Sequence, residues 1–305
     1  MTDFTTGKEL LAICREQNIP ISVAMRNREI EIGKRSEDEI DSRLDRIYDI
    51  MNEDCHRPVT DPTKSIGGLI GGESRLLWNH LNSTHRLGGT FILKAVAYSM
   101  AVLEENATMG LIVAAPTAGS SGILPGVLIA CMEERGITLD QFNSGIMNAG
   151  ALGYILMRNA SVAGAEAGCQ AEVGAASAMT ASALVELMGG TPKDCLNAAS
   201  LALSNLLGLV CDPIAGLVEA PCQSRNSIGA ANAIICADLS LCGVKHQIPF
   251  DEMVDAMYRV GRSLPFALRE TAMGGCAATP TGCSLRCKAV VGEEKAARLE
   301  PLLKV

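Results

Sequence analysis

The chain has 305 residues, of which 48% are hydrophobic, 20% are charged and 3% are aromatic, and its net charge at pH 7 is −8. A chain this apolar is not intrinsically disordered, and its negative charge and few aromatic rings argue against a nucleic-acid partner. Prolines, glycines and asparagines interrupt its longest uncharged stretches, and its N-terminus has no export-signal pattern. We therefore expect a cytoplasmic protein that spans no membrane and keeps its cysteines reduced.

The first 60 residues carry much of the charge and are predicted to form surface helices. Residues 6–9 and 36–39 each begin with Thr or Ser and end with Glu, which is the spacing of a helix-starting capping box. Residues 52–62 contain two prolines and are predicted to be a linker. This division gives an N-terminal helical segment at 1–60 and a larger domain at 61–305.

In the larger domain, glycine-rich loops alternate with predicted helices. Residues 65–73 are glycine-rich, residues 90–105 suit an apolar helix, and residues 250–264 form an amphipathic pattern. Between 145 and 243, Ala, Gly, Ser, Leu and Met dominate, as expected for helices buried on most sides. Alternating strand patterns are hard to find there. The predicted fold is all-α, a mainly helical single domain with glycine-rich loops between buried helices.

A loop at residues 115–126 has the composition of an anion site. Its glycines permit close backbone approach, and it is followed by a predicted helix whose first turn contains a proline. Backbone amides and hydroxyls at a helix N-terminus suit a carboxylate. The residues that would form this cup are Thr117, Gly119, Ser120, Ser121 and Gly122. The alternative is an ordinary connection between two core helices.

Three of the twelve cysteines, Cys169, Cys211 and Cys222, are flanked by Gly and Pro in predicted loops. Thiolates bind soft metals and iron–sulfur clusters, and three ligands would leave one iron of a four-iron cluster open for Lewis-acid chemistry. The alternative is that they are small buried hydrophobes.

The other cysteines are expected to have different roles. Four lie in apolar helical contexts and are predicted to be core residues: Cys131, Cys195, Cys236 and Cys242. Cys14 and Cys55 are taken as incidental. Cys276, Cys283 and Cys287 lie near the C-terminus, and the last two could share a helix face. One interpretation gives them a redox or metal-binding role, and the alternative is simple variation of the tail sequence.

His85, between polar and glycine residues, is a candidate catalytic base, although a solvent-facing histidine is an equal alternative. The sequence offers little support for a hydrolytic triad.

Taken together, these residues resemble the alpha chain of the bacterial iron–sulfur-dependent L-serine dehydratases of the two-subunit type, from about Ser65 to Gly282. The motifs that carry the resemblance are residues 115–126, 159–174, 211–216, 221–226 and 269–275. The resemblance implies a mainly helical catalytic domain in which Cys169, Cys211 and Cys222 ligate a [4Fe–4S] cluster. It also implies an L-serine ammonia-lyase of amino-acid catabolism and gluconeogenesis, which eliminates water from L-serine without pyridoxal phosphate while the Thr117–Gly122 loop holds the substrate carboxylate.

This chain departs from the single-chain members of that group in two ways. Their Ser-x-x-His-Thr segment is absent, so the resemblance implies that a separate beta subunit supplies the base, with His85 as the candidate in this chain. Their cysteine-bearing tail is also absent, because this chain ends in Leu302–Val305. Two alternative functions remain open: a related cluster-dependent L-cysteine desulfidase, and a metal-free, non-catalytic binding subunit.

Overall fold

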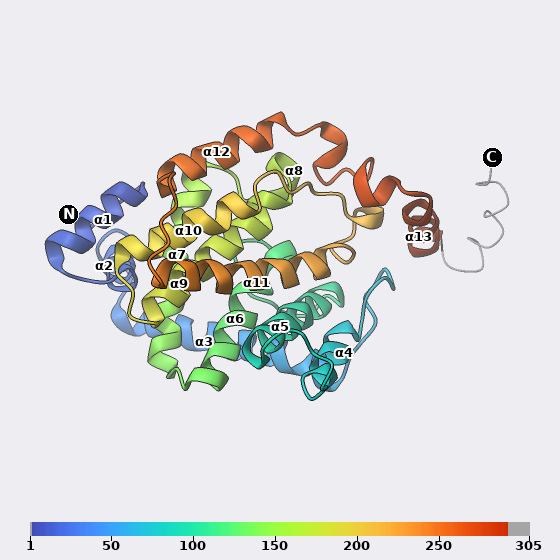
Figure 1. Ribbon diagram of the computed structural model, residues 1–305, viewed down its shortest axis with the longest axis horizontal. Helices are drawn as coiled ribbons and strands as arrows, with labels where there is room; N and C mark the ends of the chain where they lie inside the picture. Colours follow the sequence, from blue (N-terminus) through green and yellow to red (C-terminus); the bar gives the residue numbers. More distant parts are fainter. Residues whose placement is uncertain (1, 292–305) are drawn as a thin grey trace.

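The computed structural model describes residues 2–291 of the chain (Figure 1), and in this range every regular element is a helix. The α-helices of the first half are α1 (Gly7–Gln17), α2 (Ile21–Glu31), α3 (Glu37–Thr60), α4 (Glu73–His80), α5 (Thr90–Ala107), α6 (Ile123–Arg135) and α7 (Leu139–Asn159). Those of the second half are α8 (Gly164–Ala167), α9 (Ala175–Leu187), α10 (Pro192–Asn205), α11 (Cys222–Leu241), α12 (Phe250–Ser263) and α13 (Pro280–Val291). The short turns are η1 (Ala118–Ser120), η2 (Gln170–Gly174), η3 (Ile214–Gly216), η4 (Phe266–Leu268) and η5 (Gly275–Ala278). The all-α prediction is confirmed, and none of these helices is long and apolar enough to cross a membrane.

Helix α9 belongs to the core of the fold and packs against α6, α7, α10 and α11. It is built mainly from Ala, Ser and other small or apolar residues, and most of it is fully buried. A helix that is apolar on all sides belongs in a core. Small side chains also let neighbouring helices come close, as where Gly153 of α7 leaves room for the Met179 side chain of α9.

Local sequence signals correctly predict several helix boundaries. Both capping boxes form, with the Glu9 amide donating to the Thr6 hydroxyl and the Glu39 amide donating to the Ser36 hydroxyl, each at 3.2 Å. The apolar helix predicted at residues 90–105 is α5, and the amphipathic helix predicted at 250–264 is α12.

The predicted linker at residues 52–62 is wrong. Helix α3 continues to Thr60 with Pro58 inside it. Proline removes one helical hydrogen bond, but Met51, Cys55 and Val59 are buried here in the main core, in contacts that include α5 and α6. Burial of these three side chains outweighs the loss of one hydrogen bond at Pro58, since helices in proteins are stabilised mainly by packing. Helices α1–α3 thus share one core with the rest of the described chain.

Candidate active site

The fold brings the three singled-out cysteines together from distant parts of the chain. Cys169 precedes the π-helical turn η2, Cys211 lies in the loop after α10, and Cys222 is the first residue of α11. Two of the three therefore begin helical segments, where the sequence suggested loops. Their exposed fractions are 3%, 2% and 7%, and they lie near enough for the charge on Cys169 or Cys222 to raise the pKa of Cys211.

The π-helical turn sets the position of Cys169 through its neighbour Gln170. The Gln170 side chain donates to the carbonyls of Ala167 and Met257 at 3.0 and 2.9 Å and accepts from the Gly208 amide at 2.8 Å. The amide of this buried side chain is thus hydrogen-bonded to backbone groups of three separate segments. This arrangement joins η2, α12 and the loop before Cys211.

The chemistry of the three thiols fits an iron–sulfur cluster. Burial and neighbouring charges raise the pKa of Cys169 to about 12 and those of Cys211 and Cys222 well above the usual thiol range. Thiols in such surroundings ionise when a metal compensates their charge. Within the described residues, no group of three or more His, Cys, Asp or Glu side chains is placed to hold a single metal ion. A four-iron cluster places its thiolates farther apart than one ion does, so this result concerns single ions and not clusters.

A cation and a carboxylate stand beside the thiols. Burial raises the pKa of Cys169, and the Arg225 guanidinium partly opposes this. Arg225 also donates to the Val210 carbonyl at 2.8 Å and pairs with Asp212 at 2.6 Å. The other Asp212 oxygen accepts from the Cys276 amide at 2.6 Å. Asp212 thus connects the thiol group to the C-terminal segment.

Glu172 connects the predicted anion loop to the thiols. The Thr117 hydroxyl donates to Glu172 at 2.8 Å and lies 3.2 Å from the Ser120 hydroxyl, while the Cys211 sulfur lies 3.9 Å from Glu172. Part of the predicted cup is used internally, because the Ser121 hydroxyl donates to the Ala118 carbonyl and the Gly122 amide donates to Asn226. Thr117 and Ser120 are therefore the loop hydroxyls that connect to Glu172, the first directly and the second through Thr117.

Sequence reasoning missed Glu172, the carboxylate between loop and thiols. Burial, above all, raises its pKa to about 7, against the lowering effect of the Thr117 hydroxyl. A Cβ on Gly119 would lie 2.9 Å from one Glu172 oxygen, and a Cβ on Gly164 would lie 2.6 Å from the other. The available signal was a pair of acidic residues, Glu166 and Glu172, placed three residues on either side of Cys169 in a stretch otherwise poor in charge.

Glu219 was also missed, and it explains the glycine-rich segment at 65–73. This buried carboxylate accepts from the Ser65 hydroxyl at 2.6 Å and from the amides of Gly67 and Leu69 at 2.7 and 3.0 Å. A Cβ on Gly67 would collide with the carboxylate. The segment therefore wraps a side chain located three residues before Cys222.

His85 lies in an exposed loop between α4 and α5, where its backbone amide donates to Ser83 at 3.1 Å. Among residues 2–291, no recorded contact joins its ring to the thiols. Its role as a base stays a prediction.

The remaining cysteines divide by burial. Cys14, Cys55, Cys131, Cys195 and Cys236 are buried, but Cys242 is exposed at the end of α11, so its assignment to the core was wrong. Cys276 is exposed near Asp212 and Arg225. Cys283 and Cys287 both lie on α13, and the chain end at Leu302–Val305 falls outside the described residues.

Comparisons with known proteins give a consistent result. The family profile described as serine dehydratase alpha chain matches residues 16–277. A Bacillus subtilis protein named "Probable L-serine dehydratase, alpha chain" is 45% identical over 285 residues, which cover 93% of this chain and 95% of that one. The "L-serine dehydratase, alpha chain" of Peptoniphilus asaccharolyticus is 44% identical over 281 residues, covering 92% and 96%.

A longer relative differs in coverage. An Escherichia coli K12 protein named as an L-serine dehydratase is 35% identical over 281 residues, which are 90% of this chain but 62% of that one. The match to the alpha-chain family spans the anion loop, all three thiols and the Asp212–Cys276 contact. This chain belongs to the serine dehydratase alpha chain family.

Proposed function

We propose that this chain is the catalytic subunit of an L-serine ammonia-lyase, which converts L-serine to pyruvate and ammonia. The observation that carries the proposal is the meeting of three buried thiols with the hydroxyl-bearing loop at 117–122. The relatives' names supply the substrate. In the reaction, L-serine loses water to give aminoacrylate, which tautomerises to an imine, and water then hydrolyses the imine to pyruvate and ammonia.

Cys169, Cys211 and Cys222 are the residues that would hold a [4Fe–4S] cluster. When bound, such a cluster with one open iron supplies a Lewis acid that makes hydroxide a better leaving group, so that pyridoxal phosphate is not required.

The chain's own side chains would bind and orient the substrate. The hydroxyls of Thr117 and Ser120, which connect to Glu172, are assigned to the substrate carboxylate. Glu172, a partly buried carboxylate beside them, is assigned to the substrate ammonium. Fixing both groups orients the Cα–H bond toward a base and lowers the entropic part of the barrier. Glu172→Gln is expected to raise KM for L-serine, and an unchanged KM would remove it from this role.

The base is assigned to a separate beta chain, with His85 as the candidate within this chain. The segments around the thiols expose large apolar side chains: Ile66 is 70% exposed, and Phe266 and Met273 are each 64% exposed. Phe266 and Met273 flank Leu268 and Glu270, whose backbone groups pair with Cys211 at 2.9 and 2.6 Å. Exposed apolar side chains beside a site favour an interface with another protein. We place this assembly in the cytoplasm.

The decisive test is anaerobic cluster reconstitution followed by a pyruvate assay with L-serine, with and without a candidate beta chain. We expect iron and sulfide to bind this chain alone, and pyruvate to form when both chains are present. The assay should be repeated with L-cysteine, because sulfide release in preference to pyruvate from serine would favour the desulfidase alternative.

Cysteine variants test the ligand assignment separately. Cys169→Ala, Cys211→Ala and Cys222→Ala should each lose the brown colour, bound iron and serine-dependent pyruvate formation. Cys131→Ala, a matched change at a buried cysteine of α6, should keep all three. Full iron content and activity in a variant lacking all three proposed ligands would refute the cluster assignment.

A further inference from the structure

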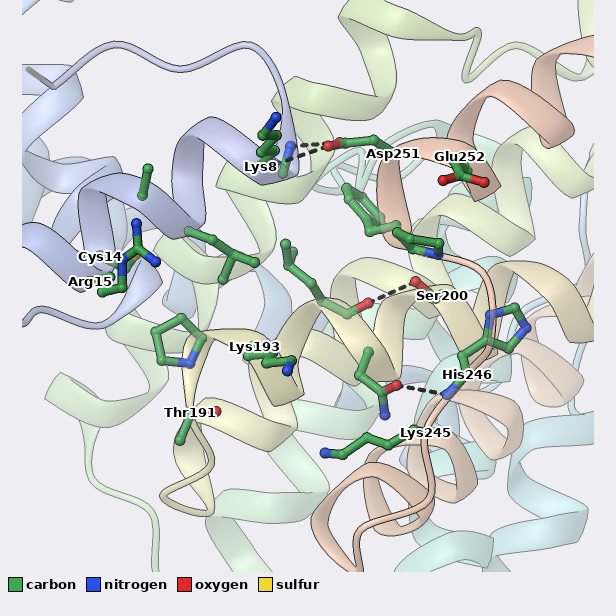
Figure 2. Close-up of a pocket in the computed structure, with 18 of the residues that line it drawn as sticks. Lys8, Cys14, Arg15, Thr191, Lys193, Ser200, Lys245, His246, Asp251 and Glu252 are labelled. Atoms are coloured by element: carbon green, nitrogen blue, oxygen red, sulfur yellow. Dashed lines mark hydrogen bonds between the residues drawn. The ribbon is translucent and has the colours of Figure 1, made fainter.

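A second concave site lies away from the thiols, between α1, the first half of α10 and the loop at residues 245–252 (Figure 2). It is a groove of about 1330 Å³. Helix α1 lies at one end of the long axis and α13 at the other (Figure 1), and α13 packs on η3, which lies between Cys211 and Cys222. The groove is thus separate from the proposed catalytic site.

The walls of the groove are held by hydrogen bonds between segments far apart in the sequence. The Asp251 carboxylate accepts from the amides of Gly7 and Lys8 at 2.6 and 3.0 Å, which ties α12 to the start of α1. The Asn197 side chain accepts from the His246 amide at 2.8 Å and donates to the Val244 carbonyl at 2.8 Å. Figure 2 shows the Asp251 and His246 contacts. The groove is therefore a preformed feature of the fold.

The floor of the groove is apolar. Leu196 and Phe250 are buried in it, with Leu11 and Ile248 beside them. A Cβ on Gly7 would lie 2.9 Å from both Leu196 and Phe250, so glycine at this position lets α1 close down on them. Such a floor favours an occupant with an apolar body.

The rim of the groove is cationic although the chain as a whole is acidic. Its lining contains four basic side chains, Lys8, Arg15, Lys193 and Lys245, against two carboxylates, Asp251 and Glu252. Asp251 is already bound to the α1 amides, and Lys245 pairs with Asp194 at 2.8 Å. Within the described residues, the charged groups of Lys8, Arg15 and Lys193 have no ion-pair partner.

We propose that this groove binds a small amphipathic anion, with a ring- or acyl-sized apolar body and a carboxylate, sulfonate or phosphate head group. The body lies on the Leu196–Phe250 floor, and the head group meets Arg15 and Lys193. The basic side chains of the rim favour a negatively charged ligand. The volume of the groove exceeds what a molecule as small as L-serine would fill.

The probe is 8-anilino-1-naphthalenesulfonate, whose fluorescence rises on apolar surfaces, compared with N-phenyl-1-naphthylamine, which lacks the sulfonate. We expect saturable binding of the sulfonate, weaker binding of the neutral amine, and no displacement by L-serine. Arg15→Glu with Lys193→Glu should weaken sulfonate binding about tenfold. Ala12→Trp, which fills the groove from α1, should also abolish it.

The matched control is Arg43→Glu with Arg46→Glu, which makes the same charge change on exposed positions of α3. It should leave sulfonate affinity within about twofold, because neither arginine lines the groove and salt screens exposed charges. Equal weakening by the control, unchanged binding in both groove variants, or displacement of the probe by L-serine would overturn the proposal. Melting temperatures of all variants establish that each is folded.

Discussion

Asp212 and Glu219 are buried carboxylates near the thiols and Glu172 is a partly buried one, and the three differ in how many donors they have. Asp212 has an arginine and a backbone amide, and Glu219 has a hydroxyl and two amides. Glu172 accepts a normal-length hydrogen bond only from Thr117 among the contacts described. The first two are therefore structural, because buried carboxylates with several donors hold their surroundings together. Glu172 has the fewest donors of the three, which supports the substrate-binding role proposed for it.

The Glu219 contacts predict a large stability effect from a small chemical change. Glu219→Gln removes the negative charge that three donors share, and we expect it to lower the free energy of unfolding by about 1–3 kcal/mol. Urea unfolding of the apo protein measures this loss. Glu16→Gln, at an exposed position of α1, should change stability by less than about 0.5 kcal/mol, and equal effects of the two substitutions would contradict our reading.

The two serines of the anion loop should behave differently. Ser120→Ala removes a hydroxyl assigned to the substrate carboxylate and is expected to raise KM for L-serine about tenfold, the cost of one charge-assisted hydrogen bond. The Ser121 hydroxyl is bonded to the Ala118 carbonyl, so Ser121→Ala should change KM less. Steady-state kinetics on the reconstituted enzyme decide this, and an identical KM in wild type and Ser120→Ala would place the carboxylate elsewhere.

Among the helical elements, α3, α5 and α6 share a polar contact at the edge of the core. Glu133 of α6 lies 2.9 Å from His56 of α3, 2.9 Å from the Tyr98 hydroxyl of α5 and 3.0 Å from Lys94. Burial raises the pKa of Glu133, but its hydrogen bonds outweigh this and lower the pKa to about 2. The pKa of His56 is raised, chiefly by its hydrogen bond to Glu133.

These opposite shifts predict a pH window for the contact. The contribution of Glu133 is present above its ordinary pKa of 4.5 and is lost as the pH falls toward about 2. The contribution of His56 is present below its ordinary pKa of 6.5 and is lost as the pH rises through its raised folded value. The stability difference between wild type and Glu133→Gln should therefore peak between these two ordinary values. We expect about 1 kcal/mol, since both groups are partly exposed.

Denaturant unfolding from about pH 3 to about pH 9 would follow the decline of this difference on both sides of its peak. Glu134→Gln, on the same helix and next to Lys94 but without the His56 contact, is the control and should lack the peak. A flat difference between wild type and Glu133→Gln would show that the contact does not act in this way.

The same helices show which features short-range sequence information could predict. Capping boxes and amphipathic spacing depend on residues within a turn or two, and they correctly located the start of α1 and the extent of α12. The end of α3 depends on burial of Cys55 and Val59 by helices that are distant in the sequence. The prediction used only the local signal of Pro58 and therefore placed the end of the helix too early. Glu172 and Glu219 were missed because their partners lie at 117 and 65–69, and spacing along the chain does not encode such pairs.

Across the whole molecule, cysteine burial follows position in the fold. Eight cysteines are buried, Cys287 is intermediate, and Cys242, Cys276 and Cys283 are exposed. The sequence motifs selected the three proposed ligands from this set, but their proximity is a property of the folded chain.

This distribution predicts an alkylation pattern. In the native apo protein under reducing conditions, iodoacetamide should label Cys242, Cys276 and Cys283 first, because thiol reactivity requires access as well as ionisation. The buried thiols should react only after denaturation, and peptide mass spectrometry would identify each site. Rapid native labelling of Cys131, Cys195 or Cys236 would contradict the fold.

The π-helical turn at Gln170–Gly174 also limits how the chain can vary in length. A π-helix uses one residue more per hydrogen-bonded ring than an α-helix does, so such a turn within a helix is equivalent to a one-residue insertion. Deleting one residue here would rotate everything before it by about 100° about the axis of α9. Cys169 would leave the other two thiols, and Gln170 would lose its three partners. Nearby glycine loops can gain or lose residues at far lower cost, so a relative that is one residue shorter at this turn is expected to lack the same thiol arrangement.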